Sequence, residues 1–522
     1  MNISTGAATR HADKLPPLIR ALFNPACYDH VIGPVQLIET HISWVLLTGE
    51  YAYKIKKPLD LGFLNFSTLA LRQHVCADEV RLNRRLAAEI YLGVIAITGT
   101  TDSPQINGTG EAIEYAVKMR QFPPDATLDQ LNERGELDYT QIDPLAARLA
   151  QFHLHECAIA TTDSPWGEPG TIAQPVMENF HILADRLGDL PENQRLAKLQ
   201  AWSKAEHQRL TPLMRERKRN GMIRECHGDL HLGNLAWVNG QLLIFDCLEF
   251  SPALRWIDII SEVAFCFMDL LHHQHRDLAM RFLNAWLEIS GDYEGMALLR
   301  YYAVYRAMVR AKVAALRAGQ TGAENADTNR AEVSACLQLA EQLSQAIPAQ
   351  LWITHGLSGS GKTTLTQSLL QERGMIRLRS DVERKRLAGF EALVRSNGGV
   401  NEGLYTQDAS RRTYAHLAHL AETLLDAGWP VIIDAAFLAR WQRDLFHEIA
   451  QRRGINFQIL DIQADPATLR ERVSQRAAQG KDASEADLRV LQHQLETAQP
   501  LDADEQPAVT PVSGSATLTG LI

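Results

Sequence analysis

The sequence lacks the features of a disulfide-bonded, membrane-spanning or general nucleic-acid-binding protein. Its seven cysteines are odd in number and scattered, with no C-x-x-C pair, which disfavours a disulfide framework or a zinc site. No uncharged apolar run approaches the ~20 residues that span a bilayer, and residues 1–17 contain no apolar segment typical of a signal peptide. The net charge of -10 disfavours nucleic-acid or membrane-surface binding in general. We expect a cytoplasmic protein, with its oligomeric state left open.

The length and the hydropathy pattern predict more than one globular domain. The chain has 522 residues, of which 46% are hydrophobic and 22% are charged. Apolar and polar residues alternate over residues 35–57 and again over 91–122, which predicts antiparallel strands. Between them, residues 67–89 have helical spacing. These elements predict a small β-rich lobe that ends at about residue 122.

The following part of the chain is predicted to be almost wholly helical, from about Asp138 to Ala346. One stretch, residues 227–250, interrupts the helices. Residues 319–331 are polar and break the pattern before one further helix. We place a domain boundary after that helix, so the first domain spans residues 1–346.

A second architecture begins at Leu351, where short apolar strands alternate with helical segments. This order predicts a parallel α/β sheet with crossover helices. We assign this domain to residues 347–500. The remaining residues, 501–522, are rich in small residues and proline and are expected to form a loosely ordered tail.

Residues 227–250, HGDLHLGNLAWVNGQLLIFDCLEF, combine a predicted hairpin with residues suited to metal binding and proton transfer. An Asn-Gly dipeptide splits two apolar runs, which is the strongest short signal for a two-residue turn. Counting back from the turn places Asn234 opposite Phe245 and beside Asp246. An amide oxygen and a carboxylate then meet at one end of the hairpin, where they can share a hard cation. Asp229 lies just upstream, where it can receive a proton from an acceptor hydroxyl.

A second motif follows the strand LWITH and opens a helix. GLSGSGKT is a complete G-x-x-x-x-G-K-T pattern. Glycines let backbone N–H groups close around phosphate oxygens, and the helix N-terminus adds a favourable dipole. Lys362 is expected to reach the β- and γ-phosphates, and the Thr363 hydroxyl to bind magnesium. The residues expected to hold the nucleotide are Gly356, Ser358, Gly359, Ser360, Gly361, Lys362, Thr363 and Thr364.

Asp434 ends the later apolar strand VIID. It is a candidate for holding the same magnesium ion through water, and an ordinary structural cap is the competing interpretation. No N/T-K-x-D guanine signature is present in the sequence, so we expect ATP rather than GTP.

HGDLHLGN followed by IFDCLEF resembles the catalytic and metal-binding motifs of the aminoglycoside phosphotransferase family, a branch of the protein-kinase-like fold. The resemblance implies a first domain with two lobes. It also implies that Asp229 is the catalytic base and that Asn234 and Asp246 are metal ligands. Because acceptor-binding residues differ widely within the family, the word aminoglycoside does not transfer to this chain.

The same resemblance extends to the predicted β-rich lobe. Lys54 resembles the phosphate-binding lysine of the third strand, with Lys56 as the alternative, and Glu79 would be its ion-pair partner. The kinase glycine-rich loop is absent, and the corresponding turn reads ETHISWV. We therefore expect Ser43 and backbone amides to cover the phosphates.

The second domain resembles small P-loop kinases of the polynucleotide-kinase, gluconate-kinase and zeta-toxin type, within the broad AAA group. The resemblance rests on the P-loop, on S-D-x-x-R in RLRSDVERK, and on two arginines one helical turn apart in LRERVSQR. It implies that Asp381 is the acceptor base and that Arg384 contacts the acceptor or a phosphate. Arg472 and Arg476 would form a lid, although exposed helix arginines are commonly just solvated.

The fusion of these two domains resembles a bacterial family of predicted bifunctional kinases. We expect an ATP- and Mg²⁺-dependent phosphotransferase with two nucleotide sites, each passing the γ-phosphoryl group to a hydroxyl of a small molecule. A rival interpretation makes the P-loop domain an ATP sensor that regulates the first domain. A third is an enzyme that phosphorylates or nucleotidylates a protein.

Overall fold

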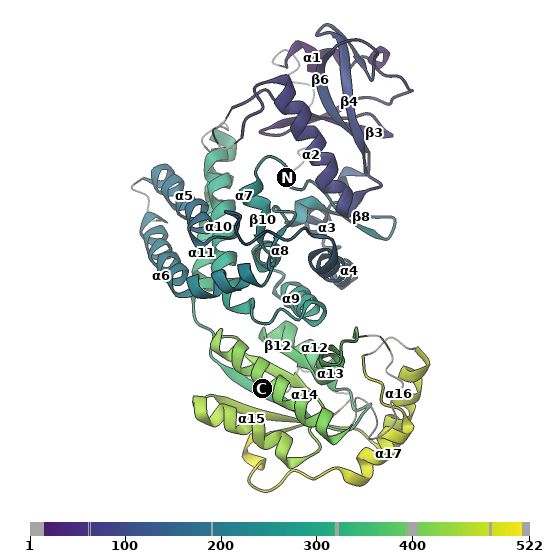
Figure 1. Ribbon diagram of the computed structural model, residues 1–522, viewed down its shortest axis with the longest axis vertical. Coiled ribbons are helices and arrows are strands. Elements are labelled where there is room, and N and C mark those ends of the chain that lie inside the picture. Colours follow the sequence, from purple (N-terminus) through teal and green to yellow (C-terminus); the bar gives the residue numbers. More distant parts are fainter. Residues whose placement is uncertain are drawn as a thin grey trace. The chain divides into compact units, whose positions relative to one another are not determined.

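The computed structural model describes residues 15–60, 62, 64–188, 192–318, 323–392, 394, 406–479 and 483–513 (Figure 1). It confirms the predicted fold class, α+β in the kinase-like part and parallel α/β in the P-loop part. The chain folds into two compact units: Met1–Pro144, Gln151–Glu178 and His207–Asp269 form unit 1, and Leu145–Ala150, Asn179–Glu206 and Leu270–Ile522 form unit 2. None of the helices within the described ranges combines the length and apolarity that a bilayer crossing demands.

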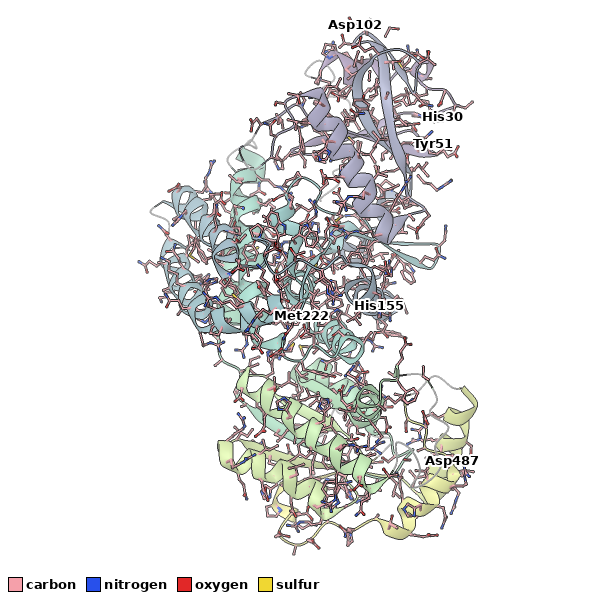
Figure 2. The ribbon with its side chains drawn as sticks, in the orientation of Figure 1. His30, Tyr51, Asp102, His155, Met222 and Asp487 are labelled. Atoms are coloured by element: carbon pink, nitrogen blue, oxygen red, sulfur yellow. The ribbon has the colours of Figure 1, made fainter. Side chains whose placement is uncertain are left out.

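Unit 1 contains a six-stranded antiparallel sheet in the order β1-β2-β3-β6-β4-β5. Its strands are β1 (Gln36–Glu39), β2 (Ser43–Leu47), β3 (Tyr51–Lys56), β4 (Tyr91–Thr100), β5 (Ser103–Ile106) and β6 (Ala112–Arg120). Helix α2 (Leu69–Ala87) packs on β4 and β6. The predicted strands and helix are confirmed, and β5 is an addition that follows a turn containing Asp102 (Figure 2).

The predicted hairpin is present in unit 1. Strands β8 (Leu235–Val238) and β9 (Gln241–Ile244) pair around the Asn-Gly turn, whose two residues have φ of 52° and 76°. The Phe245 N–H donates to the Asn234 carbonyl over 3.0 Å, which confirms the predicted register. Leu243 of β9 packs against the core beneath α2 and β6, so the hairpin is tied to the sheet.

Two further strands, β7 (Ile223–Glu225) and β10 (Trp256–Asp258), pair antiparallel on either side of the hairpin in sequence. They interrupt the region predicted to be helical, and at three residues each they are too short to leave a periodic signal. The helices up to residue 344 are α1 (Pro17–Ala21), η2 (Pro25–Cys27), η3 (Pro124–Ala126), α3 (Leu128–Glu133), α4 (Tyr139–Gln151), η4 (Phe152–Glu156), α5 (Pro169–Leu187), α6 (Glu192–Arg219), η5 (Leu232–Asn234), α7 (Pro252–Arg255), α8 (Ile259–His272), α9 (Arg276–Ser290), α10 (Met296–Ala318) and α11 (Ala323–Ser344).

Unit 2 contains a five-stranded parallel sheet in the order β12-β13-β11-β14-β15. Its strands are β11 (Gln350–His355), β12 (Ile376–Arg379), β13 (Val431–Asp434), β14 (Asn456–Gln463) and β15 (Val509–Ser513). The helices are α12 (Lys362–Arg373), α13 (Ser380–Leu387), α14 (Gln407–Asp426), α15 (Arg440–Arg453), α16 (Pro466–Gln479), α17 (Leu488–Thr497) and η7 (Gln506–Ala508). Buried apolar residues of α12 and the sheet form its core.

Two sequence predictions are wrong in this part. The expected loose tail, 501–522, contains β15, because Val509–Ser513 add a parallel strand to the exposed edge of β14 and bury Val512 in the core. The expected polar break at 319–331 is also too long, because α11 already begins at Ala323. Residues 514–522 lie outside the described ranges.

Candidate active sites

Two lysines of β3 share one buried carboxylate in unit 1. Lys54 and Lys56 are two residues apart and therefore lie on one face of the strand. The Lys54 Nζ is 2.8 Å from one Glu79 oxygen, and the Lys56 Nζ is 2.6 Å from the other. Lys54 also contacts the Asp246 carboxylate, whereas Lys56 lies 2.5 Å from Glu249. The sequence left the two lysines as alternatives, and Lys54 is the one that reaches the predicted metal ligand.

The ion pairs hold these groups in their charged forms. Burial by itself lowers the pKa of Lys54, but the charges of Asp246 and Glu79 outweigh it and raise that pKa well above its usual value. Burial likewise raises the pKa of Asp246, but Lys54 lowers it below the ordinary range. Three carboxylates, counting Glu249, meet two lysines here. The surplus negative charge and the oxygen donors are suited to a hard divalent cation.

His227 supports the loop that carries Asp229. Its Nε2 lies 2.8 Å from the Phe245 carbonyl oxygen, and the Asp229 N–H donates to its Nδ1 over 3.3 Å. Because a carbonyl only accepts and an N–H only donates, the ring is a neutral tautomer protonated on Nε2. Burial lowers the pKa of His227, which favours the same neutral form.

Asp229, Asn234 and Asp246 meet at the open end of the hairpin. The Asn234 side-chain N–H₂ donates to the Asp229 carbonyl over 2.9 Å and to its carboxylate over 3.1 Å. This leaves the Asn234 amide oxygen as a possible ligand for a cation. Asp246 has a φ of 62°, and its N–H donates to the Tyr91 hydroxyl. The Asp229 carboxylate is 38% exposed, so a substrate can reach it.

The expected phosphate-covering turn is formed differently from the prediction. Ser43 is fully buried at the start of β2 and pairs in register with Lys56 of β3. Thr40 closes the turn, because its hydroxyl accepts the Ser43 N–H over 2.9 Å. The Ser43 side chain is therefore part of the sheet and is not presented by the turn.

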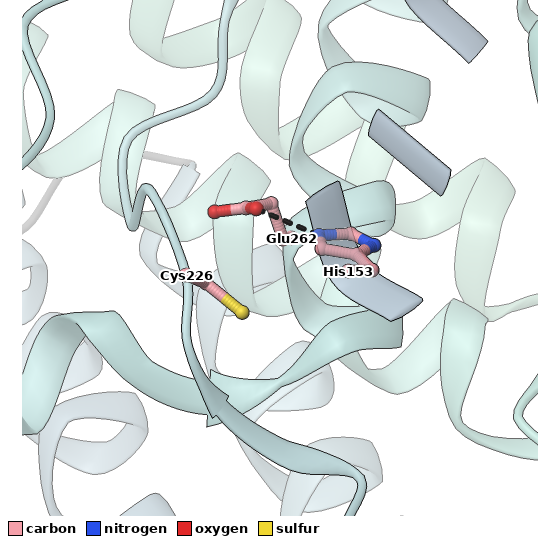
Figure 3. Close-up of side chains that lie close together, drawn as sticks. All are labelled: His153, Cys226 and Glu262. Atoms are coloured by element: carbon pink, nitrogen blue, oxygen red, sulfur yellow. Dashed lines mark hydrogen bonds and ion pairs between the residues drawn. The ribbon is translucent and has the colours of Figure 1, made fainter. Parts of the chain in front are cut away.

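Sequence reasoning missed a buried cluster of Cys226, His153 and Glu262 next to the loop that carries Asp229 (Figure 3). Glu262 accepts the Gly228 N–H over 2.7 Å and lies 2.8 Å from the His153 Nε2. Gly228 has a φ of 89°, and a Cβ there would meet the Leu254 carbonyl at 2.9 Å. These are ligand types for zinc, but both Glu262 oxygens already have partners. We interpret the cluster as a support for the loop that carries Asp229.

The P-loop of unit 2 surrounds its own lysine. The Lys362 Nζ donates to the Gly356 and Leu357 carbonyls over 3.0 and 2.8 Å. Burial lowers the pKa of Lys362 to about 8, against the opposing charges of Asp434 and Asp381.

A cavity of about 780 Å³ opens on this loop. Most of the P-loop residues that the sequence singled out line it, together with other predicted site residues: Ser358, Gly359, Gly361, Lys362, Thr363, Thr364, Asp381, Arg384, Asp434, Arg472 and Arg476. Gly356 and Ser360 lie instead against a neighbouring cavity, and Ser360 is buried.

The charged residues of the cavity contact one another and the loop. Arg384 donates to Asp381 over 3.0 Å, and although burial raises the pKa of Asp381, the Arg384 charge and other contacts lower it. Arg472 donates to the Gly359 carbonyl over 3.4 Å, so this lid candidate lies directly on the P-loop. Arg476 donates to the Ala486 carbonyl over 3.3 Å.

Asp434 is nearly buried at the end of β13, where the Thr366 hydroxyl donates to it over 3.4 Å. The Thr366 Oγ1 is also 3.1 Å from the Thr363 carbonyl oxygen, so its single proton has an acceptor on either side, and Thr366 links Asp434 to the P-loop helix. Arg379 is a further residue of this site, and no sequence motif pointed to it. It lines the cavity, and its Nε is 3.9 Å from the Asp434 carboxylate.

The P-loop site and most residues of the first site lie in regions that match known families; Lys54 and Lys56 precede the first matched region. Residues 71–299 match the phosphotransferase enzyme family, and residues 351–501 match an AAA domain. Rv2004c of Mycobacterium tuberculosis and Mb2027c of Mycobacterium bovis, each named as an uncharacterized protein, are 30% identical to this chain over 403 residues. The matched part is 77% of this chain and 78% of each relative. The chain belongs to the family of these proteins.

This chain joins a phosphotransferase-family domain to an AAA-type P-loop domain, which confirms the predicted fusion. The chain is a kinase-type enzyme, and its P-loop domain is of a nucleotide-binding class.

The solved structures to which this chain is similar include two kinases. A choline/ethanolamine kinase family protein from Mesorhizobium loti is 8% identical, with a TM-score of 0.38, over 61% of this chain and 90% of its own. A gluconokinase from Sinorhizobium meliloti 1021 is 20% identical, with a TM-score of 0.24, over 34% of this chain and 89% of its own.

Proposed function

We propose that the chain carries two ATP- and Mg²⁺-dependent sites, each of which transfers the γ-phosphoryl group of ATP to a hydroxyl of a small molecule. The observation that carries the proposal is the joined set of Lys54, Glu79 and Asp246 beside Asp229. The cavity that joins the P-loop to Asp381 supports the second site in the same way.

At the first site, Lys54 binds phosphate oxygens while Glu79 holds its ammonium group in place. Asn234 and Asp246 are the residues that would hold magnesium, which, when bound, supplies positive charge to the phosphate oxygens. Asp229 orients the acceptor hydroxyl and takes its proton. The new O–P bond forms as the bond from the γ-phosphorus to the bridging oxygen breaks, and ADP leaves.

At the second site, the P-loop N–H groups and Lys362 bind the β- and γ-phosphates. Thr363 and Asp434 would hold magnesium, and Asp381 takes the proton of the acceptor hydroxyl. Arg384 holds Asp381 from one side, while Arg472 and Arg476 neutralise the transferring phosphoryl group. Positioning and charge stabilisation, rather than covalent catalysis, account for the rate.

The partners that we propose are small-molecule hydroxyl acceptors, with neither membrane nor nucleic acid among them. We also propose a cytoplasmic location. Each of the seven cysteines is a buried free thiol, which supports a reducing compartment.

The test is incubation of the purified chain with γ-labelled ATP, Mg²⁺ and a metabolite extract, followed by mass analysis of newly phosphorylated species. Wild type is compared with Asp229→Ala and Lys362→Ala. Each variant is expected to lose one of two sets of products. If either single variant abolishes both sets, the proposal of independent sites is wrong.

A second candidate is an ATP-sensing P-loop domain that regulates the first site. The observation that favours it is the contact of helix α9, which lies within the phosphotransferase match, with strand β12 of the P-loop sheet. Under this candidate, Lys362→Ala changes the kinetics of the first site, and Asp381→Asn has no effect on turnover.

A further inference from the structure

Helix α9 covers the free edge of the P-loop sheet within unit 2. Strand β12 is the last strand in the sheet order, so one side of its backbone lacks a neighbouring strand. The Asn284 side chain takes that place. Its N–H₂ donates to the Met375 carbonyl over 3.2 Å, and its oxygen accepts the Arg377 N–H over 2.8 Å.

One helical turn further along α9, Glu288 meets two arginines of β12. Its Oε1 accepts from the Arg377 Nη2 over 2.6 Å and from its Nε over 3.1 Å, and its Oε2 accepts from Arg379 over 3.4 Å. Arg377 and Arg379 are two apart, so they lie on the same face of the strand. Glu288 is 16% exposed, which makes these charge-assisted bonds stronger than surface pairs.

Both arginines continue from Glu288 to the P-loop site. The Arg377 Nη1 donates to the Thr363 carbonyl over 3.3 Å and to the Thr366 hydroxyl over 3.4 Å. The Arg379 Nε is 3.9 Å from the Asp434 carboxylate. Thr363 and Asp434 are the residues that would hold magnesium. Glu288 does not line the cavity, but it holds the side chains of Arg377 and Arg379 next to the residues that would hold magnesium.

We propose that Glu288 is a positioning residue for the P-loop site, which acts by holding Arg377 on the Thr363 turn and Arg379 away from full pairing with Asp434. The inference rests on the proposed nucleotide site of this domain. Without the Glu288 charge, Arg379 pairs more closely with Asp434 and competes with magnesium for that carboxylate.

The test is equilibrium dialysis of ATP against the full-length chain over a range of Mg²⁺ concentrations, in an Asp246→Asn background that disables the first site. Glu288→Gln is expected to raise the half-saturating Mg²⁺ concentration about tenfold, the size of one charge-assisted contact. Affinity for ATP without Mg²⁺ is expected to change far less. Glu288→Asp, which keeps the charge, should give a smaller shift.

The matched control is Asp277→Asn, which removes the same charge from an exposed position in the first turn of α9. It is expected to leave the Mg²⁺ dependence unchanged. Adding Arg379→Gln to Glu288→Gln removes the competing cation and is expected to restore the half-saturating concentration. A purely structural role for Glu288 predicts a lower Tm in both variants and no such rescue.

The outcomes separate the two proposals. If the Asp246→Asn chain binds no ATP at any Mg²⁺ concentration, the proposed P-loop function fails, and this inference fails with it. If that chain binds ATP but Glu288→Gln leaves the Mg²⁺ dependence unchanged, the role of Glu288 alone is wrong. Should Glu288→Gln fail to fold, the Glu288→Asp variant still tests the role of Glu288. An unchanged half-saturating Mg²⁺ concentration in that variant would overturn the role.

Discussion

The two proposed phosphate sites are built from different parts of the protein. In unit 1, the charged groups are side chains from β3, α2 and the β8–β9 hairpin, joined by buried ion pairs. In unit 2, a single continuous turn bends its backbone around Lys362, whose Nζ bonds to two loop carbonyls. The first arrangement depends on tertiary packing, whereas the second is largely local. The stability and pH response of the two sites should therefore differ.

The largest expected effect separates the two sites by their proposed bases. Asp229→Asn is expected to lower transfer at the first site about 10³-fold, and Asp381→Asn to do the same at the second, since each removes a proton acceptor. The measurement is kcat for each set of products. Asp102→Asn, in the exposed β4–β5 turn (Figure 2), is the control. Equal losses of both activities in one variant would contradict the separation.

The next contrast compares the two lysines. Lys54→Met leaves the partly buried Asp246 without its cation and the buried Glu79 with Lys56 alone, so we expect the free energy of unfolding to fall by about 3 kcal/mol. Lys362→Met removes a buried charge whose direct partners are carbonyls, so we expect a change within about 1 kcal/mol. Urea denaturation of both variants measures the difference. A larger loss in the Lys362 variant would reverse the comparison.

A pH series should sharpen the contrast. The pKa of Lys362 is lowered to about 8, so above that pH the free amine is neutral and must take up a proton to bind phosphate. ATP affinity at the P-loop is expected to fall about fivefold from about pH 8 to about pH 9, as the protonated fraction of Lys362 falls. The pKa of Lys54 is raised well above its usual value, so the first site should show no such decline. Dialysis with Asp246→Asn and with Lys362→Ala isolates each site.

Lys362 also affects how the free energy of unfolding changes with pH. A base whose folded pKa lies below its unfolded value opposes folding while it is charged. That cost is full below about pH 8 and is relieved as the pH rises towards 10.5, the value without burial. Between about pH 8 and pH 10.5, the loss of charge on Lys362 therefore stabilises the folded protein. It offsets part of the loss of stability that other titrating groups cause over the same range. Lys362→Met should lack this compensating term in paired denaturation curves.

The smallest expected effect tests the support behind the first site. Glu262→Gln keeps an acceptor for the Gly228 N–H but removes the charge that faces His153. We expect kcat at the first site to fall about fivefold, near 1 kcal/mol, with the second site unchanged. Glu178→Gln, exposed in the middle of α5, is the matched control. An equal effect at both sites would indicate general destabilisation instead.

The sequence predicted the local features of the two sites well and the features that depend on tertiary packing poorly. The Asn-Gly turn and the alternation around it predicted the register that sets Asn234 opposite Phe245, because a two-residue turn determines the pairing. The P-loop was recognisable because its residues are contiguous. β15 could not be read from its composition, because its stability comes from pairing with β14 and from burying Val512.

The sequence by itself determined the residues of two proposed phosphate-binding motifs and the fold class around them, because those motifs depend on local turns and on spacing along one segment. Only the tertiary structure decided which lysine meets Asp246, that Glu262 supports Gly228, and that Glu288 reaches the P-loop through two arginines. These contacts join groups far apart in the chain. Burial and charge within the folded core decide which of these groups pair, and the periodicity of the sequence does not predict those pairs.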